Sequence, residues 1–395
     1  RQMCIRDRIE DGSGNPVEAT GDEQVELFRS VKAGNGRVEI ALTDGGTLSA
    51  AQVNDLSVAG TANCYVVSAP GTYVFNARVR GNGAGEGVGF EPAIEMADGM
   101  TADWLWTDSE GLVSGVALDT TSGDIFLTVG EGRGNALVAL MQDGKVVWSW
   151  HVWVTDAPQT MTYGNGTVFM DRNLGAAGTT AGGTDAYGMY YQWGRKDPFY
   201  GGEKTETSAN AFLEAKNGTV VNPAYPALDW AFSKSATTTD GAAANPMTFY
   251  NDKVGTGYNW LASPNATLWG EAKTLNDPCP PGYRVPGTGA WEDLISGRQY
   301  IDGVSVWDGT NYGMTYTHGG QTAWYPAQGY RNYSSGAIVG LRSSTGGSGA
   351  YWSAETSSVK SYYLFFRSKL SSSGSINNEL DMNRSYGYTV RCCKE

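Results

Sequence analysis

Short apolar runs separated by turn residues recur along this chain. The clearest pair covers residues 136–141 and 145–153, with Gln-Asp-Gly at 142–144 between them. Asp-Gly between two apolar runs is the strongest short-range signal for a β-hairpin. In the second run, apolar side chains occupy both alternating sets of positions, which predicts a strand covered on both faces.

Further strands are predicted at 64–67 and 73–75, on either side of the turn at 69–71. In that turn Pro sets φ and Gly supplies a positive φ. Residues 25–28 and 38–42 are shorter strand candidates, and the sequence assigns them no partner.

Three short helices are expected in the C-terminal part. One spans about 185–193, and another covers 208–216. A third begins after Thr288, a suitable N-cap, with Glu292 and Asp293 in its first turn, where the helix dipole favours negative charge. The rest reads as short strands and long polar loops. The predicted fold class is therefore mainly β with an α+β C-terminal part.

Composition narrows the class of protein. The chain has 395 residues, enough for two or three domains, with 54 Gly, 12% aromatic and 17% charged residues. This balance favours an all-β or α+β surface protein. A net charge of −13 without a basic run argues against nucleic acid as a partner. No apolar stretch is long enough for a transmembrane segment.

The chain divides into four expected segments. Residues 1–8 read as a translated sequencing adapter, with a genuine basic start as the alternative. Residues 9–55 are the tail of an upstream domain or a tether, and 56–156 form a β-sandwich module. Residues 157–395 form the C-terminal domain, after a linker at Asp156-Ala157-Pro158. We expect export, with a signal sequence upstream of the present start.

Five sequence motifs occur in order along the C-terminal part. They are DRNLGA at 171–176, YYQWGRKDPF at 190–199, DPCPPGYRVP at 277–286 leading into WEDL, YWS at 351–353 and YTVRCCKE at 388–395. Together they resemble the Fib-succ-major paralogous (FISUMP) domain family over roughly residues 163–395. The segments 62–65 and 148–156 are similar to a module that often precedes that domain.

The resemblance implies a C-type-lectin-like fold. It also implies a lipoprotein or fimbria-associated protein on the surface of a Gram-negative gut anaerobe, exported to the cell surface or secreted. Charged and aromatic residues of the motifs are expected to be structural, forming buried, satisfied pairs that fix loop geometry. These residues are Asp171, Arg172, Asn173, Trp193, Arg195, Asp197, Arg284, Trp352 and Arg391.

The resemblance also implies a disulfide between Cys279 and Cys392. In the family pattern Val-Arg-Cys is followed by a variable residue, so Cys392 holds the shared position and Cys393 the variable one. Side chains alternate along a strand, so Cys393 faces away from Cys392. Cys64 is expected to be a buried free thiol and Cys393 free or partly exposed, while Cys4 is set aside with the adapter segment.

No motif predicts catalysis, a cofactor or a metal. His151 lies among tryptophans in a predicted strand and reads as structural, whereas His318 lies in a loop without a second ligand nearby. The glycine-rich segment 81–87 lacks the Lys-Ser/Thr of a phosphate loop. Calcium-binding lectins use Glu-Pro-Asn or Gln-Pro-Asp with Trp-Asn-Asp, and both are absent. A carboxylate pair for glycoside hydrolysis stays open, because sequence cannot reveal it.

The predicted function is non-catalytic adhesion or recognition, not an enzyme activity. Its partners would be a glycan or a host or bacterial surface protein, and also fimbrial subunits. Alternatives are a structural or assembly subunit of a fimbria, or an accessory domain of a carbohydrate-active enzyme. Aromatic faces bind sugars and protein hot spots, although core packing is the competing interpretation. The candidate ligand-binding residues are Trp307, Trp324, Tyr325, Tyr330 and Arg331.

Overall fold

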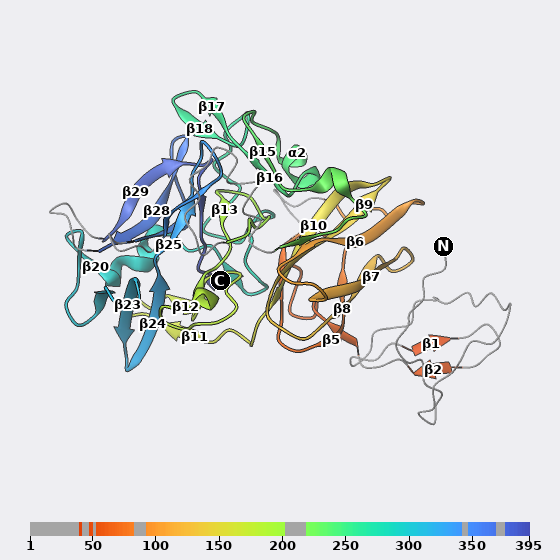
Figure 1. Cartoon of the computed structure of the whole chain (residues 1–395), viewed down its shortest axis with the longest axis horizontal. Helices are drawn as coiled ribbons and strands as arrows, with labels where there is room; N and C mark the ends of the chain where they lie inside the picture. Colours follow the sequence, from red (N-terminus) through yellow and green to blue (C-terminus); the bar gives the residue numbers. More distant parts are fainter. Residues whose placement is uncertain are drawn as a thin grey trace.

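The computed structural model describes residues 39–41, 47–49, 53–82, 92–201, 219–341, 347–368 and 376–395. Cys4, the strand predicted at 25–28, the helix predicted at 208–216 and residues 83–87 lie outside these ranges. The described residues are mostly β, which confirms the predicted fold class (Figure 1). None of their helices is long and apolar enough to cross a membrane.

Strands account for nearly all regular structure in the N-terminal part. They are β1 (Glu39–Ala41), β2 (Thr47–Ser49), β3 (Val53–Asp55), β4 (Cys64–Val67), β5 (Gly71–Asn76), β6 (Met100–Thr107), β7 (Val113–Asp119), β8 (Asp124–Val129), β9 (Gly134–Gln142) and β10 (Lys145–Val154).

The C-terminal part holds more and shorter strands. They are β11 (Thr160–Thr162), β12 (Val168–Met170), β13 (Tyr191–Gln192), β14 (Val220–Val221), β15 (Ala231–Ser233), β16 (Thr248–Tyr250), β17 (Asp252–Val254), β18 (Gly257–Asn259), β19 (Tyr283–Arg284), β20 (Ile295–Ser296), β21 (Gln299–Tyr300), β22 (Ser305–Asp308), β23 (Gly313–His318), β24 (Gln321–Pro326), β25 (Gln328–Arg331), β26 (Ile338–Leu341), β27 (Ser348–Ser357), β28 (Lys360–Arg367), β29 (Ile376–Asn383), β30 (Gly387–Tyr388) and β31 (Cys393–Lys394). The helices among the described residues are η1 (Thr184–Ala186), η2 (Pro226–Leu228), α2 (Thr239–Ala244) and η3 (Thr288–Leu294).

Two sheets form a β-sandwich in the N-terminal part, with strand orders β3-β5-β8-β7 and β14-β6-β9-β10-β4. Their inner faces share a core in which the ring of Phe75 lies 5.1 Å from Tyr65 and 5.2 Å from Trp150. The predicted hairpin is confirmed, because β9 and β10 pair antiparallel around Asp143 and Gly144, whose φ values are 51° and 74°. Positive φ at both central residues is what a tight hairpin turn requires.

The strands predicted at 64–67 and 73–75 are also present, but they do not pair with each other. β4 runs parallel to β10, whereas β5 pairs with β3 and β8 in the opposite sheet. The turn between them therefore carries the chain from one sheet to the other. Residues 39–41 form a strand within the predicted 38–42, and β2 is its antiparallel partner.

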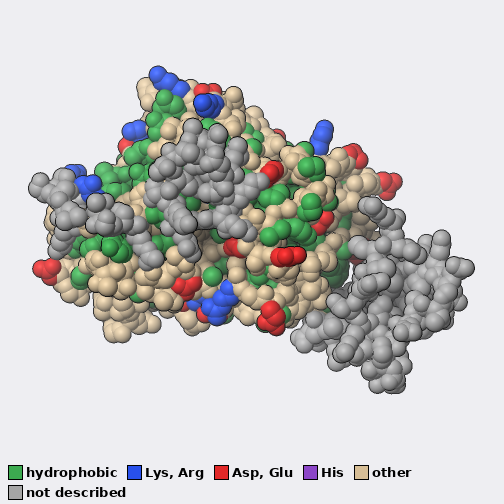
Figure 2. Space-filling model, in the orientation of Figure 1, with side chains coloured by type: hydrophobic (Ala, Val, Ile, Leu, Met, Phe, Trp, Pro, Cys, Tyr) green, Lys and Arg blue, Asp and Glu red, His purple; other side chains and the backbone are tan. Residues whose placement is uncertain are grey.

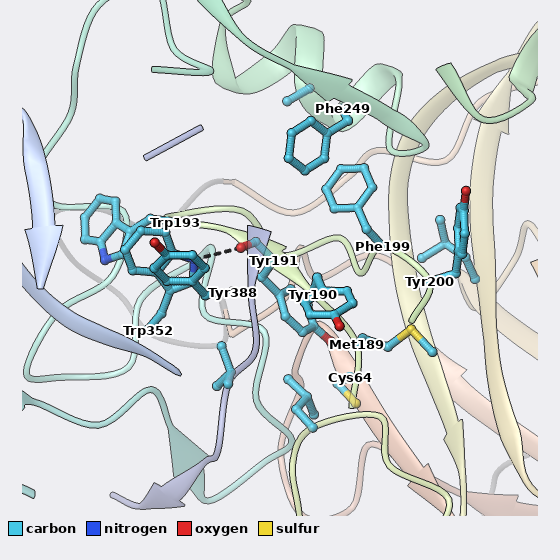
Figure 3. Close-up of a cluster of buried hydrophobic side chains, with 14 of the residues drawn as sticks. Cys64, Met189, Tyr190, Tyr191, Trp193, Phe199, Tyr200, Phe249, Trp352 and Tyr388 are labelled. Carbon is cyan, nitrogen blue, oxygen red and sulfur yellow. Dashed lines mark hydrogen bonds between the residues drawn. The ribbon is translucent and has the colours of Figure 1, made fainter. Parts of the chain in front are cut away.

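A second core lies on the other face of the five-stranded sheet. There Trp106 and Trp153 pack in one cluster with Trp193, Phe199 and Trp352 of the C-terminal part, as Figure 3 shows for its central members. The prediction that the strand at 145–153 is covered on both faces is thus confirmed. Two residues from beyond the linker even extend this sheet, because β14 pairs with β6.

The C-terminal part is built around a seven-stranded sheet of order β13-β30-β25-β27-β28-β29, with β26 paired to β25. A four-stranded sheet, β11-β12-β31-β19, and a three-stranded sheet, β22-β23-β24, accompany it. A third core cluster lies on this side and includes Phe169, Trp291, Tyr325 and Phe366.

The disulfide prediction is confirmed. Cys279 and Cys392 are bonded across a sequence separation of 113. Val390 and Cys392 belong to the core cluster that contains Trp193, whereas Cys393 belongs to the cluster that contains Phe169, so successive side chains face opposite cores. Cys64 and Cys393 are buried free thiols.

Of the two helix predictions within the described residues, one is wrong and the other is confirmed only as a 3₁₀ helix. Residues 185–193 form one 3₁₀ turn, η1, and then β13, because the main-chain N–H groups of Met189 and Tyr190 bond the distant carbonyls of Leu174 and Phe199. The segment after Thr288 is a 3₁₀ helix, capped by Gly287 without a side-chain bond.

The only α-helix in the described residues, α2, was not predicted. Its N-cap is Thr238, whose hydroxyl accepts a hydrogen bond from the N–H of Gly241 at 3.0 Å. The sequence signal was present as a capping threonine before three alanines.

Candidate functional site

The structure separates the five residues predicted to bind a ligand. Trp324, Tyr325 and Arg331 are buried, and only Trp307 and Tyr330 are partly exposed. Trp307 packs on the core cluster that contains Phe169, whereas Tyr330 packs on the cluster that contains Trp193. The five side chains therefore do not form one surface, and a ligand in solvent does not reach the three buried ones.

Tyr325 is the most deeply buried of the aromatic side chains in this set. Its hydroxyl shares a 2.5 Å hydrogen bond with that of Tyr163, and the guanidinium of Arg391 lies 3.8 Å from its ring centre. Burial raises the pKa of the Tyr325 phenol, so it stays protonated. Its ring is a core side chain, and replacing it by Ala would open a cavity instead of removing a ligand contact.

Tyr330 belongs to a cluster of partly exposed tyrosines, which we call the tyrosine face. Its members are Tyr258 from β18, Tyr330 from β25, Tyr333 after β25 and Tyr386 before β30. Neighbouring ring centres lie 4.6 Å apart for Tyr258 and Tyr333, 4.9 Å for Tyr333 and Tyr386, and 5.7 Å for Tyr330 and Tyr386. Four rings from distant parts of the chain thus form one continuous aromatic surface.

Buried aromatic side chains form the floor of the tyrosine face. The ring of Tyr388 lies 5.5 Å from Tyr330, 4.8 Å from Tyr363 and 4.3 Å from Trp352. Figure 3 shows Tyr388 beside Trp352, whose indole N–H donates to the carbonyl of Tyr191 at 2.8 Å. The face is therefore the outer end of the core that joins the two parts of the chain.

The phenols of the tyrosine face are available for bonding. Within the described residues, the hydroxyls of Tyr258, Tyr330, Tyr333 and Tyr386 make no hydrogen bond. Burial, with Tyr330 and Tyr333 nearby, raises the pKa of Tyr386 to about 12, and burial also raises the pKa of Tyr330. Both phenols are thus neutral at physiological pH, and a neutral phenol both donates and accepts.

Two buried arginines hold the main chain that carries these tyrosines. The guanidinium of Arg331 donates to the carbonyl of Tyr200 at 2.7 Å and to that of Gly336 at 2.5 Å. Its bond to Gly336 closes the loop that presents Tyr333. Such charge-assisted bonds fix loop geometry.

Arg384 does the same on the other side of the face. Its guanidinium donates to the carbonyls of Asn265 at 2.9 Å, Ser358 at 3.1 Å and Lys360 at 3.2 Å. It also lies 4.4 Å from the ring centre of Trp193. Arg384 precedes Tyr386 by two residues, so the segment that presents this tyrosine is tied to the loop at Asn265 and to the β27–β28 hairpin.

Polar side chains lie at one margin of the tyrosine face, on and beside the β17–β18 hairpin. Lys253 is exposed and lies directly opposite Tyr258 in the β17–β18 hairpin, which places both side chains on the same face. Lys360 pairs with Asp381 at 3.2 Å. Figure 2 shows hydrophobic side chains reaching the surface where Figure 1 places β28 and β29, with lysine and arginine side chains at the margins.

Most of the structural motif residues are buried, and several of them bond one another. Asn173 is fully buried and donates to Gln328 at 2.8 Å and Tyr351 at 3.1 Å, while its oxygen accepts from Arg391 at 2.8 Å. The buried indole N–H of Trp193 donates to the carbonyl of Ser353 at 2.9 Å. These contacts fit the structural role predicted for them.

Arg172 is paired with carboxylates, whereas Arg284 is partly exposed. The guanidinium of Arg172 donates hydrogen bonds to Asp171 and to Asp156. Its bond to Asp156 lowers the pKa of that carboxyl to about 2. The Arg284 guanidinium donates to the carbonyl of Val285 at 3.1 Å. The bonds of Arg172 fix the turn at the start of the C-terminal part.

A buried charge cluster adjoins the YYQWGRKDPF motif. Asp197 accepts from Lys196 at 2.5 Å and from Ser149 of β10 at 2.7 Å, and the Arg195 guanidinium lies 3.7 Å away. The Arg195 guanidinium also donates to the carbonyl of Thr248 at 2.7 Å. The cluster links the sandwich to the C-terminal part, and its side chains are buried.

The two histidines differ in burial and lie in different parts of the fold. His151 is buried and bonds Asn135 at 2.8 Å, and burial lowers its pKa to about 3. His318 is exposed at the end of β23 beside Tyr316. In the part of the chain that the structure describes, no group of three or more His, Cys, Asp or Glu could hold a metal ion.

A pocket of about 280 Å³ lies at one end of the sandwich. It is lined by the loop after β4, the loop before β9 and the end of β10. Two of its charged side chains are paired, because Arg133 bonds Asp156 at 2.9 Å and Asp156 also bonds Arg172 at 2.9 Å. The lining contains no aromatic side chain, so it offers less to a ligand than the tyrosine face does.

Tyr258, Tyr333 and Tyr386 were missed by the sequence analysis. Each stands among Asn, Ser, Gly and Arg residues, in the strings GYN, RNYSS and RSYGY. A tyrosine in such a polar segment is a usable signal for an exposed ring.

Comparison of the sequence with protein-family models and with curated proteins, and of the chain with solved structures, finds no match.

Proposed function

We propose that this protein is a non-catalytic recognition protein that binds a glycan or a surface protein through the tyrosine face. The observation that carries the proposal is a continuous set of partly exposed tyrosine rings whose hydroxyls have no partner within the described residues. Tyrosine is enriched in binding surfaces because one end is apolar and the other forms hydrogen bonds.

The rigidity of the tyrosine face supports a role in recognition. The rings contact one another, and Arg331 and Arg384 tie the segments that carry them to neighbouring loops. A surface already ordered before binding loses less conformational entropy when its ligand arrives. The face is thus suited to a specific partner.

The proposed setting is the cell surface. The Cys279–Cys392 disulfide fits an oxidising compartment and is compatible with export. Membership of the FISUMP family, with a C-type-lectin-like fold and a place on fimbriae, is likewise part of the proposal and is supported by the five sequence motifs.

The test uses the full chain on arrays of glycans and of immobilised surface proteins. A fragment of residues 157–395 is unsuitable, because it would expose the core shared by Trp153 and Trp193. We expect Tyr333→Ala to reduce binding at least tenfold and Trp307→Ala to leave it within about twofold. If Trp307→Ala loses binding and Tyr333→Ala does not, the binding site lies at β22 instead. If both variants still bind fimbrial subunits, an assembly role is favoured.

A further inference from the structure

We infer that the tyrosine face binds a short soluble saccharide, with sugar rings against the tyrosine rings and sugar hydroxyls bonded to the phenols. This inference rests on the proposed function and narrows its ligand to one chemical class. It draws on ring geometry, on unsatisfied hydroxyls and on the polar side chains at the margin.

Ring geometry excludes a flat polymer surface as the natural ligand. Adjacent ring planes are tilted by 47° for Tyr258 and Tyr333, 51° for Tyr333 and Tyr386, and 64° for Tyr330 and Tyr386. A crystalline polysaccharide presents one plane, which fits coplanar rings. Tilted rings instead fit separate sugar units that rotate about their linkages, as they do in a soluble oligosaccharide.

The phenol hydroxyls favour a saccharide over an apolar protein patch. The four rings, whose neighbouring centres lie 4.6–5.7 Å apart, carry hydroxyls without an internal partner among the described residues. An apolar partner would strip water from them and leave them unpaired, which costs free energy. A sugar combines an apolar C–H face with hydroxyls at its edge, so it covers the rings and satisfies the phenols together.

The margin of the face adds donors suited to sugar hydroxyls. Lys253 lies opposite Tyr258 and has no ion-pair partner in the described residues. Asn383 is partly exposed and stands beside the β17–β18 hairpin, with its side-chain oxygen 3.0 Å from where a Cβ on Gly257 would lie. An amide donates and accepts at once, which suits neighbouring hydroxyls on one sugar ring.

The experiment titrates the full chain with two soluble mixtures, namely oligosaccharides from partial hydrolysis of plant polysaccharides and glycans released from mucin. Two further arms use the deglycosylated mucin protein and insoluble cellulose and chitin. Variants are Tyr333→Ala and the double variant Tyr333→Phe with Tyr386→Phe. The matched control is Tyr312→Ala, a partly exposed tyrosine that makes no ring contact with the face in the described residues.

We expect at least one soluble mixture to bind. Tyr333→Ala should weaken that binding at least tenfold, the double Phe variant about threefold to tenfold, and Tyr312→Ala less than twofold. Near-ultraviolet circular dichroism checks that each variant is folded. The double Phe variant keeps the rings and removes only hydroxyls, so its loss reports the bonds that define the saccharide.

The outcomes separate this inference from the proposed function. Tyrosine-dependent binding of the deglycosylated protein, or of cellulose or chitin, without binding of the soluble mixtures would overturn the saccharide inference and leave the recognition surface in place. Full affinity of the double Phe variant for a soluble mixture would also overturn it. If folded Tyr333→Ala binds every probe as the unaltered protein does, both proposals fall.

Discussion

Removing the Cys279–Cys392 disulfide should lower stability more than any comparable change of a buried cysteine. The bond closes a loop with a sequence separation of 113, and the chain-entropy relation then gives about 16 cal/mol/K, or about 5 kcal/mol at 25 °C as an upper value. The perturbation is Cys279→Ala with Cys392→Ala, measured by urea unfolding of the full chain.

The turn around Cys279 should still form in that variant. Asp277 accepts from the N–H groups of Cys279 at 2.8 Å and Val285 at 2.9 Å, and the ammonium of Lys273 donates to the Cys279 carbonyl at 2.9 Å. These bonds do not need the disulfide. We therefore expect a folded protein with a lower unfolding midpoint and a steeper dependence of free energy on urea, because the unfolded chain without the bond exposes more surface.

Cys393→Ala is the matched control, because Cys393 is a buried free thiol on the opposite face of the same strand segment. Truncating this small buried side chain should cost roughly 1–2 kcal/mol. If the double variant loses no more stability than Cys393→Ala does, the disulfide does not constrain the unfolded chain as argued, and the reasoning is refuted.

Three further predictions concern pH, metal removal and loop anchoring. Burial lowers the pKa of His151 from 6.5 to about 3. Below about pH 6.5 the unfolded chain therefore binds a proton at His151 that the folded chain does not bind, and the free energy of unfolding falls towards pH 3. Burial also raises the pKa of Asp108 to about 6, so protonation of Asp108 makes the folded protein more stable as the pH falls from about 6 to 4. The test for His151 is therefore the variant His151→Gln, which should reduce the loss of stability at acid pH, measured as the urea-unfolding midpoint at each pH. EDTA should leave the melting temperature within a few degrees, since the sequence lacks the calcium-binding triplets, and a larger drop would show that a metal stabilises the fold. Arg331→Lys should cost roughly 2 kcal/mol in urea unfolding, because Lys cannot reproduce the fork that reaches Tyr200 and Gly336, and an unchanged midpoint would contradict the anchoring role.

Local and alternating signals in the sequence were sufficient for much of the fold. The Asp143-Gly144 turn identified its hairpin, and apolar residues on both faces of 145–153 predicted a strand covered twice, as the two cores on either side of β10 show. Strand alternation from Val390 to Cys393, with the family pattern, predicted which cysteine is bonded. These features depend on neighbours in sequence, which is why they were predictable.

The misses depend on partners far along the chain. Residues 185–193 look helical until their N–H groups meet the carbonyls of Leu174 and Phe199. Tyr330 and Arg331 are adjacent and both polar at one end, yet the first is partly exposed and the second is buried against Tyr200. Which of two neighbours faces solvent is decided by β26, β27 and β30 packing around β25, and sequence alone does not reveal that arrangement.

Hydroxyl-radical footprinting of the full chain tests the central claim most directly, because it reads the exposure of individual Tyr and Trp side chains. The chain is labelled alone and with a saturating amount of whichever glycan or protein probe it retains on the arrays, and the modified residues are mapped by mass spectrometry. The account predicts protection of Tyr258, Tyr333 and Tyr386 by the ligand, with Tyr312 and Trp307 labelled equally in both states. Unchanged labelling of the three tyrosines, or protection centred on Trp307, would contradict it.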